Sequence, residues 1–151
     1  MGIVDAIEGH VVYFDANVFV YALEGYQPYI QPLDALFEAV DAGRIRAVTS
    51  QLALAEVLVK PLMDDNTRLQ EAYADAIRTS GSLSVIDVSR EILVQAARLR
   101  ATHRTLRLPD AIHIATAQSA RCDAFLTNDD RLRAVAAPRV LMLSPFVLTG
   151  R

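Results

Sequence analysis

Short apolar runs alternate with longer segments of helical periodicity along the whole of this chain. The apolar runs cover residues 10–14, 45–50, 83–88, 124–127 and 139–143, and each has the length of a buried strand. The segments 16–25, 31–43, 51–60, 67–78, 90–101 and 109–120 have the spacing of helices. Strands that alternate with helices form right-handed βαβ units. The pattern therefore predicts an α/β fold, with a central, mainly parallel sheet flanked by helices.

Local signals indicate where the helices begin and end. Ser50 and Ser89 are expected to cap the helices that follow them, because a serine side chain accepts from free backbone N–H groups. Gly25, Gly43 and Gly81 are typical of helix ends. Pro61 is expected to end the helix that begins at residue 51, and Asp130 to cap a short helix over 131–135.

Length and composition predict one cytoplasmic domain. The chain has 151 residues, of which 52% are hydrophobic, which suits a single domain over residues 1–151. Cys122 is the only cysteine, so an internal disulfide cannot form and a reducing, cytoplasmic setting is expected. The first ten residues lack the basic segment of a signal peptide. No uncharged apolar run approaches the ~18 residues of a membrane span.

Four acidic residues stand at positions that can carry chemistry. Asp15 and Asp129 each follow an apolar strand, and Asp110 stands in the first turn of a largely apolar helix. Glu56 is the only charged residue between positions 51 and 59, and a buried charge is costly unless it is paired or bound to metal. Each acid also has a simpler explanation: a helix cap, a favourable place in the helix dipole, or an exposed helix edge.

Taken together, the four acids predict a cation site. Sites in such folds gather beyond the carboxyl ends of the strands, so all four side chains could converge on one edge of the sheet. Carboxylates in one cleft raise each other's pKa unless a cation lies among them. Hard oxygen ligands favour Mg²⁺ or Mn²⁺, and no cysteine–histidine group supports zinc. Such ions serve phosphate chemistry, which points to hydrolysis of a phosphodiester by activated water. His113, one turn after Asp110, is a secondary candidate.

Four motifs in order resemble those of PIN-domain ribonucleases. They read YFDANVFVYAL, TSQLALAEVLVKPL, LPDAIHIATAQ and DAFLTNDDRL, and the similarity runs from about residue 11 to residue 144. Within that family they look most like the VapC-type toxins of bacterial toxin–antitoxin pairs. The resemblance implies a PIN-like three-layer α/β/α fold, which agrees with the alternation of strands and helices.

The resemblance also implies a site and its partners. Asp15, Glu56, Asp110 and Asp129 match the family's four catalytic, metal-binding acids, and Asn17 and Thr127 match supporting polar positions. The implied activity is a ribonuclease that depends on Mg²⁺ or Mn²⁺ and cleaves RNA. The implied partners are a second copy of the chain, in a homodimer, and a VapB-like antitoxin whose C-terminal segment occupies the cleft.

Arginines are expected to form the substrate rim of an acidic site, because contacts to phosphate dominate the affinity of proteins for nucleic acid. Fourteen of the fifteen basic residues are arginine, although the net charge is −3. Arg104, Arg107 and Arg131 are the predicted substrate-binding residues, with Arg98, Arg100 and Arg133 nearby in the sequence. An ordinary solvated surface, or a genome rich in arginine codons, would explain the same residues.

Two other functions fit the same residues. The chain could be a catalytically silent PIN-fold module that holds RNA or a partner without cutting, although four mutually repelling acids then have no purpose. It could also be a phosphatase for small phosphate esters. Cleavage of RNA in the presence and absence of metal separates these functions from a nuclease.

Overall fold

The centre of the molecule is a five-stranded, all-parallel sheet with the strand order β3-β2-β1-β4-β5. This computed structural model describes residues 2–135 and 137–146. The strands are β1 (Val11–Phe14), β2 (Arg46–Ser50), β3 (Leu83–Ile86), β4 (Ala124–Thr127) and β5 (Arg139–Met142). All five lie within the predicted runs, so the predicted sheet is confirmed.

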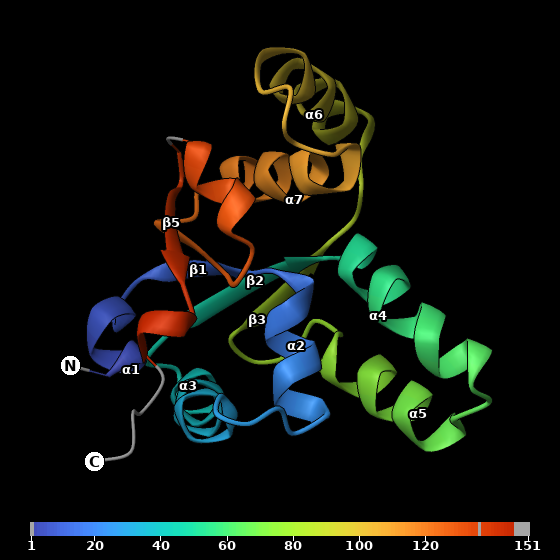
Figure 1. The fold of residues 1–151 in the computed structure, drawn as a ribbon. Helices are drawn as coiled ribbons and strands as arrows, with labels where there is room; N and C mark the ends of the chain where they lie inside the picture. Colours follow the sequence, from blue (N-terminus) through green and yellow to red (C-terminus); the bar gives the residue numbers. More distant parts are fainter. Residues whose placement is uncertain (1, 136, 147–151) are drawn as a thin grey trace.

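Helices cover both faces of the sheet (Figure 1). One layer holds α6 (Arg90–Thr102) and α7 (Leu108–Ser119). The other holds α1 (Ile3–Ile7), α2 (Ala16–Leu23), α3 (Ile30–Asp41), α4 (Gln51–Met63) and α5 (Thr67–Ala76). Two short 3-10 helices, η1 (Asp130–Ala134) and η2 (Ser144–Phe146), follow β4 and β5. The arrangement is the three-layer α/β/α fold that the sequence predicts.

Each strand sends alternate side chains into two separate cores. On β1, Phe14 is buried against the α1–α5 layer, whereas Tyr13 is buried against α6 and α7. On β4, Leu126 and Phe125 divide in the same way. The sheet is therefore apolar on both faces, and polar side chains have access to water chiefly at its ends.

The pairing of the two central strands positions the site. Phe14 lies opposite Leu126 in the register of β1 and β4, and the Asp15 N–H donates to the Leu126 carbonyl at 3.0 Å. Asp15 and Thr127 therefore leave the sheet side by side at its carboxyl edge.

Most of the predicted helix signals are confirmed. Ser50 accepts from the Leu52 N–H and Ser89 from the Ile92 N–H, so both serines are N-caps. Gly43 directly follows the C-cap of α3 with a φ of +77°, a conformation that few other residues adopt. The short helix α1 was not expected from the sequence.

Three expected boundaries are wrong. Helix α4 continues past Pro61 to Met63, because a proline in the last turn removes only one backbone hydrogen bond and its ring is buried in the core. Helix α5 ends at Ala76, several residues before Gly81. The cap of η1 is Asp129, whose carboxylate accepts from the Arg131 N–H, and not Asp130.

Within the described residues, no helix is both long and apolar enough to cross a membrane.

Candidate active site

Asp15 lies at the junction of β1 and α2 and is nearly buried, with 9% of its surface exposed. One carboxylate oxygen accepts from the Ala16 N–H at 2.9 Å. Asp15 therefore caps α2, as expected of an aspartate at the start of a helix. The other oxygen accepts from the Thr127 hydroxyl at 2.7 Å and from the Asn17 amide at 3.4 Å. The residue thus combines a structural cap with a polar contact across the sheet edge.

Thr127 connects the two strand ends. Its side chain is fully buried, and its hydroxyl oxygen accepts from the Asn17 amide at 3.3 Å and from the Asp129 N–H at 3.0 Å. One hydroxyl therefore fixes Asp15, Asn17 and the backbone that carries Asp129. The sequence predicted Asn17 and Thr127 as supporting residues, and the structure brings both against Asp15.

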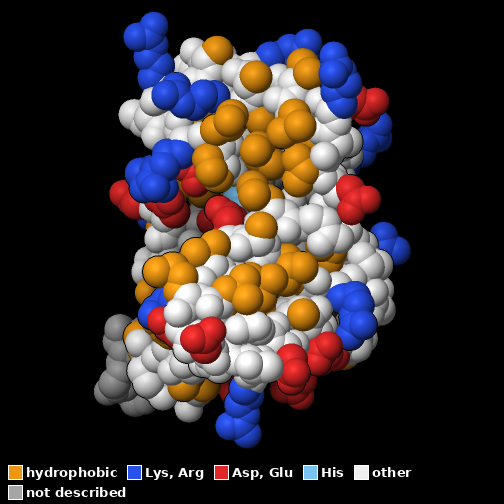
Figure 2. All heavy atoms as spheres, turned by 90° about the vertical axis from the view of Figure 1, so that its right-hand side faces the viewer, with side chains coloured by type: hydrophobic (Ala, Val, Ile, Leu, Met, Phe, Trp, Pro, Cys, Tyr) orange, Lys and Arg blue, Asp and Glu red, His pale blue; other side chains and the backbone are white. Residues whose placement is uncertain are grey.

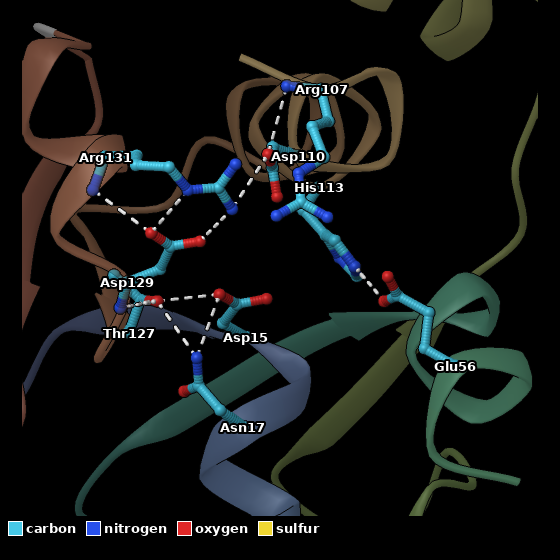
Figure 3. A network of polar contacts seen from close by, with 9 residues as sticks. All are labelled: Asp15, Asn17, Glu56, Arg107, Asp110, His113, Thr127, Asp129 and Arg131. Carbon is cyan, nitrogen blue, oxygen red and sulfur yellow. Dashed lines mark hydrogen bonds and ion pairs between the residues drawn. The ribbon is translucent and has the colours of Figure 1, made fainter. Parts of the chain in front are cut away.

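Glu56 belongs to a second group of contacts in the site, which it forms with His113 and Tyr13. It lies on α4, and its carboxylate contacts His113 Nε2 at 2.5 Å (Figure 3). His113 lies on α7 and is buried, and its Nδ1 is 2.6 Å from the Tyr13 hydroxyl. The charge that looked costly in an apolar helix is therefore 36% exposed and paired with an imidazole.

Asp110 and Asp129 are joined by an arginine. Arg131 donates from Nε to one oxygen of Asp129 at 3.0 Å and from its terminal nitrogen to the other. The same terminal nitrogen lies 3.4 Å from an oxygen of Asp110. Asp110 also accepts from the Arg107 N–H at 3.1 Å, which closes the first turn of α7.

The environment shifts the pKa values of Asp15, His113 and Asp129, among other groups of the site. Burial raises the pKa of Asp15, although the charge of His113 and the hydrogen bond from Thr127 oppose the shift. Burial also favours the neutral form of His113, but the hydrogen bond to Glu56 and the charges of Asp15, Glu56 and Asp110 outweigh it and raise the imidazole pKa. The hydrogen bond from Arg131 lowers the pKa of Asp129.

The predicted residues share one edge of the sheet but do not enclose a single point. Figure 3 shows Asp15, Asp110 and Asp129 facing a common space, while Glu56 turns toward His113 from the far side. Over residues 2–135 and 137–146, no three acidic, histidine or cysteine side chains are grouped closely enough to hold one ion. The Arg131 guanidinium occupies the place between Asp110 and Asp129.

The donor set nevertheless suits a hard cation. The acids offer carboxylate oxygens, which Mg²⁺ and Mn²⁺ prefer. The amide nitrogen of Asn17 contacts Asp15, whereas its amide oxygen is buried and has no hydrogen-bond partner in the described part of the chain. A buried acceptor without a donor is uncommon in proteins and indicates a missing polar partner. A rotation of the Asn17 amide would present this oxygen to a hydrated cation beside Asp15.

The predicted arginine rim is distributed unevenly. Arg131 lies in the site, where it pairs with acids. Arg107 lies at the start of α7, and its side chain extends toward the same space in Figure 3. Arg104 is exposed on the turn before α7, so its role in substrate binding stays a prediction.

Sequence reasoning missed Tyr13 and ranked His113 too low. Tyr13 sits within an apolar strand, where a buried aromatic residue needs no special explanation. His113 gave one usable signal, because it follows Asp110 by three residues and so lies on the same face of α7. Only the packing of α7 against the sheet shows that His113 contacts Glu56 on one side and Tyr13 on the other.

Fold and site together define an α/β protein with a carboxylate-rich polar site at the carboxyl edge of a parallel sheet. The chain belongs to the PIN domain family, whose sequence profile matches residues 12–138. The family resemblance expected from the four motifs is thereby confirmed.

Solved structures share this fold. The VapBC2 complex of Rickettsia felis bound to a promoter DNA fragment contains a chain 15% identical, with a TM-score of 0.69 over 87% of this chain and 98% of that one. A toxin–antitoxin complex from Klebsiella pneumoniae is 22% identical, with a TM-score of 0.64 over 87% and 97%. VapC20 of Mycobacterium tuberculosis, a toxin that cleaves the sarcin–ricin loop, is 20% identical, with a TM-score of 0.60 over 76% and 86%.

Among curated proteins, no sequence matches this chain significantly.

Proposed function

We propose that this protein is a divalent-metal-dependent endoribonuclease that hydrolyses RNA phosphodiester bonds. One observation carries the proposal: Asp15 keeps a carboxylate nearly buried at the edge that Asp110 and Asp129 also face. An acid buried beside other acids is costly unless a cation compensates it. Membership of the PIN domain family supports the same reading.

Asp15, Glu56, Asp110 and Asp129 are the proposed ligands of Mg²⁺ or Mn²⁺. When bound, the ion would neutralise phosphate charge and make a bound water more acidic. Thr127 orients Asp15 through its 2.7 Å hydrogen bond, and His113 fixes the Glu56 carboxylate. Arg107 and Arg104 are the proposed contacts to the RNA backbone. Arg131 is a third proposed contact, in the state in which metal replaces it as the partner of Asp110 and Asp129.

A toxin of a toxin–antitoxin pair is the biological role that we propose. The similar structures include complexes of toxins with antitoxins, and VapC20 is described as a toxin that cleaves an RNA loop. Their identity to this chain is low, so the shared fold supports the role without establishing the substrate. A cytoplasmic location follows from the proposed substrate and the proposed partner.

The surface around the site supports a protein partner. In Figure 2, hydrophobic side chains gather in two bands, with carboxylates and a histidine between them. Exposed hydrophobic residues include Val59, Leu62 and Met63 on α4, and Leu108 at the start of α7. We propose that a VapB-like antitoxin segment covers this surface and that the protein itself is a homodimer. Light scattering of the purified protein, alone and with the product of an adjacent gene, measures both assemblies.

The decisive experiment incubates purified protein with total RNA in Mg²⁺, Mn²⁺ or EDTA and sequences the product ends. Asp15→Asn should abolish cleavage yet keep the fold, because the asparagine oxygen can still cap the helix while its NH2 group donates to the Thr127 hydroxyl oxygen. Asp34→Asn is the matched control, since Asp34 is exposed on α3, away from the site. Cleavage that persists in EDTA or in Asp15→Asn would refute the proposed chemistry.

The same experiment tests the silent module. The pairing of Arg131 with Asp110 and Asp129 is the observation that favours it, because those acids are already compensated without metal. RNA that binds equally well in EDTA and in Mn²⁺ and yields no products would identify a binding module.

A further inference from the structure

Three tyrosines form a compact aromatic group beside the acid site. The rings of Tyr21 and Tyr29 are stacked, with centroids 4.7 Å apart and planes 11° apart. The ring of Tyr26 lies 5.1 Å from that of Tyr21 at an angle of 34°. Tyr21 belongs to α2, and the other two lie between α2 and α3. We refer to these three residues as the tyrosine platform.

The platform is tied to the loop that carries the acids. Asn128, the residue between Thr127 and Asp129, donates from its amide to the Tyr29 hydroxyl at 2.9 Å and to the Tyr21 hydroxyl at 3.5 Å. Its amide oxygen accepts from the Ser144 N–H at 3.2 Å. Asn128 is therefore held from several sides, and it fixes the platform relative to the acids.

Helix α2 provides a second link. Asn17 and Tyr21 are four residues apart, so they lie on the same face of the helix, about one turn or ~6 Å apart along its axis. Asn17 contacts Asp15 and Thr127 directly. The platform thus begins one helical turn from the carboxylates.

Packing explains only part of this group. Tyr21 and Tyr29 are half-buried against the core of the α1–α5 layer, but Tyr26 is 45% exposed and contributes nothing to that core. The exposed Tyr26 ring packs against Tyr21, which is itself stacked on Tyr29, so the group presents a supported aromatic surface to solvent.

We propose that the tyrosine platform binds a nucleobase of single-stranded RNA, with Tyr26 as the stacking ring. This inference rests on the proposed function, since it places the scissile phosphate at the acids and a nearby base of the same strand on the platform. Sequence-tolerant stacking on aromatic side chains is how proteins hold unpaired bases. The platform then selects unpaired over double-stranded RNA, because a base within a helix has no free face.

A fluorescence experiment tests stacking without cleavage. The chain has no tryptophan, so Tyr26→Trp introduces a single indole that keeps the stacking surface. In EDTA, a short single-stranded RNA should quench this emission, and an oligomer of abasic ribose phosphates of the same length should not. Leu93→Trp is the matched control, because Leu93 lies on α6 and is 46% exposed. Equal quenching of the two variants, or equal quenching by the abasic oligomer, overturns the proposal.

An affinity measurement gives an independent result. Tyr26→Ala should weaken binding of the same RNA roughly fivefold or more, the loss expected when one base loses its aromatic partner. Tyr26→Phe should bind like the wild type. A fall in melting temperature without any loss of affinity would mean that the platform is only structural.

Failure of this inference is distinguishable from failure of the proposed function. Quenching by RNA without cleavage in Mn²⁺ would support base stacking on the platform and refute the proposed nuclease activity. Cleavage without quenching would support the nuclease activity and refute base stacking on the platform.

Discussion

Arg131 holds both carboxylate oxygens of Asp129, and the same guanidinium reaches Asp110 at 3.4 Å. The Arg131 side chain thus compensates the charge of two of the four acids that are predicted to bind a metal ion. The lowered pKa of Asp129 follows from the hydrogen bond with Arg131. In the proposed enzyme, a divalent ion and this guanidinium compete for the same oxygens.

Replacing Arg131 should therefore increase the affinity of the site for a divalent ion. Arg131→Gln is expected to strengthen Mn²⁺ binding roughly two- to fivefold, the scale of a partly exposed ion pair, and to lower the melting temperature slightly in EDTA. Titration calorimetry and the Mn²⁺-induced shift in melting temperature measure both effects. Arg133→Gln is the control, since Arg133 pairs with Asp130 on the surface. Identical behaviour of the two variants would show that Arg131 does not compete with the ion.

Loss of the Thr127 hydroxyl should destabilise the strand ends. Thr127→Val keeps the shape of the side chain but removes one hydrogen bond each from the buried Asp15 carboxylate, the Asn17 amide and the Asp129 N–H. We expect the free energy of unfolding to fall by about 1–3 kcal/mol. Thr116→Val is the matched control, because its buried hydroxyl only donates to the Ile112 carbonyl within α7. Urea denaturation of both variants provides the comparison, and an equal loss in each would contradict the role of Thr127.

The imidazole of His113 should titrate above the ordinary histidine range as long as Glu56 is present. Burial alone would lower its pKa, so Glu56→Gln is expected to shift the pKa downward. Because the folded pKa is raised, the stabilisation from this pair is complete below the unfolded pKa of about 6.5 and is lost as the pH rises through the folded value. Imidazole NMR signals of the metal-free protein, followed with pH, report the shift. An unchanged pKa in the variant would exclude control by Glu56.

Cys122 should be unreactive in the native protein. Burial, with a smaller contribution from the charge of Asp123, raises the pKa of its thiol to about 12. At pH 8 the thiolate fraction is then only about one in ten thousand, and the thiolate is the reactive form. A chromogenic disulfide reagent should react slowly with native protein, faster as the pH rises, and at once after unfolding in urea. Rapid reaction of the native thiol at pH 8 would contradict this.

Local patterns in the sequence were enough to predict the layers and to place Asp15 and Asp129 just after the ends of strands. Apolar strands that alternate with helices leave few topologies, and parallel strands place their carboxyl ends at one edge. The pairing of Arg131 with Asp129 and of His113 with Glu56 could not be predicted, because it depends on side-chain conformations and on the docking of α4 and α7. The tyrosine platform was missed for a similar reason: the turn over residues 24–29 that brings its rings together has no periodic pattern.

The two central strands position Asp15 and Thr127, and the lengths of these strands cannot vary independently. Asp15 follows β1 and Thr127 ends β4, so a single residue inserted in either strand would reverse the direction of its last side chain and separate the two. Strand β3, at the outer edge of the sheet, provides none of the nine residues drawn in Figure 3. Engineers who wish to lengthen, tag or circularly permute this scaffold therefore have freedom near β3 and almost none at the centre of the sheet.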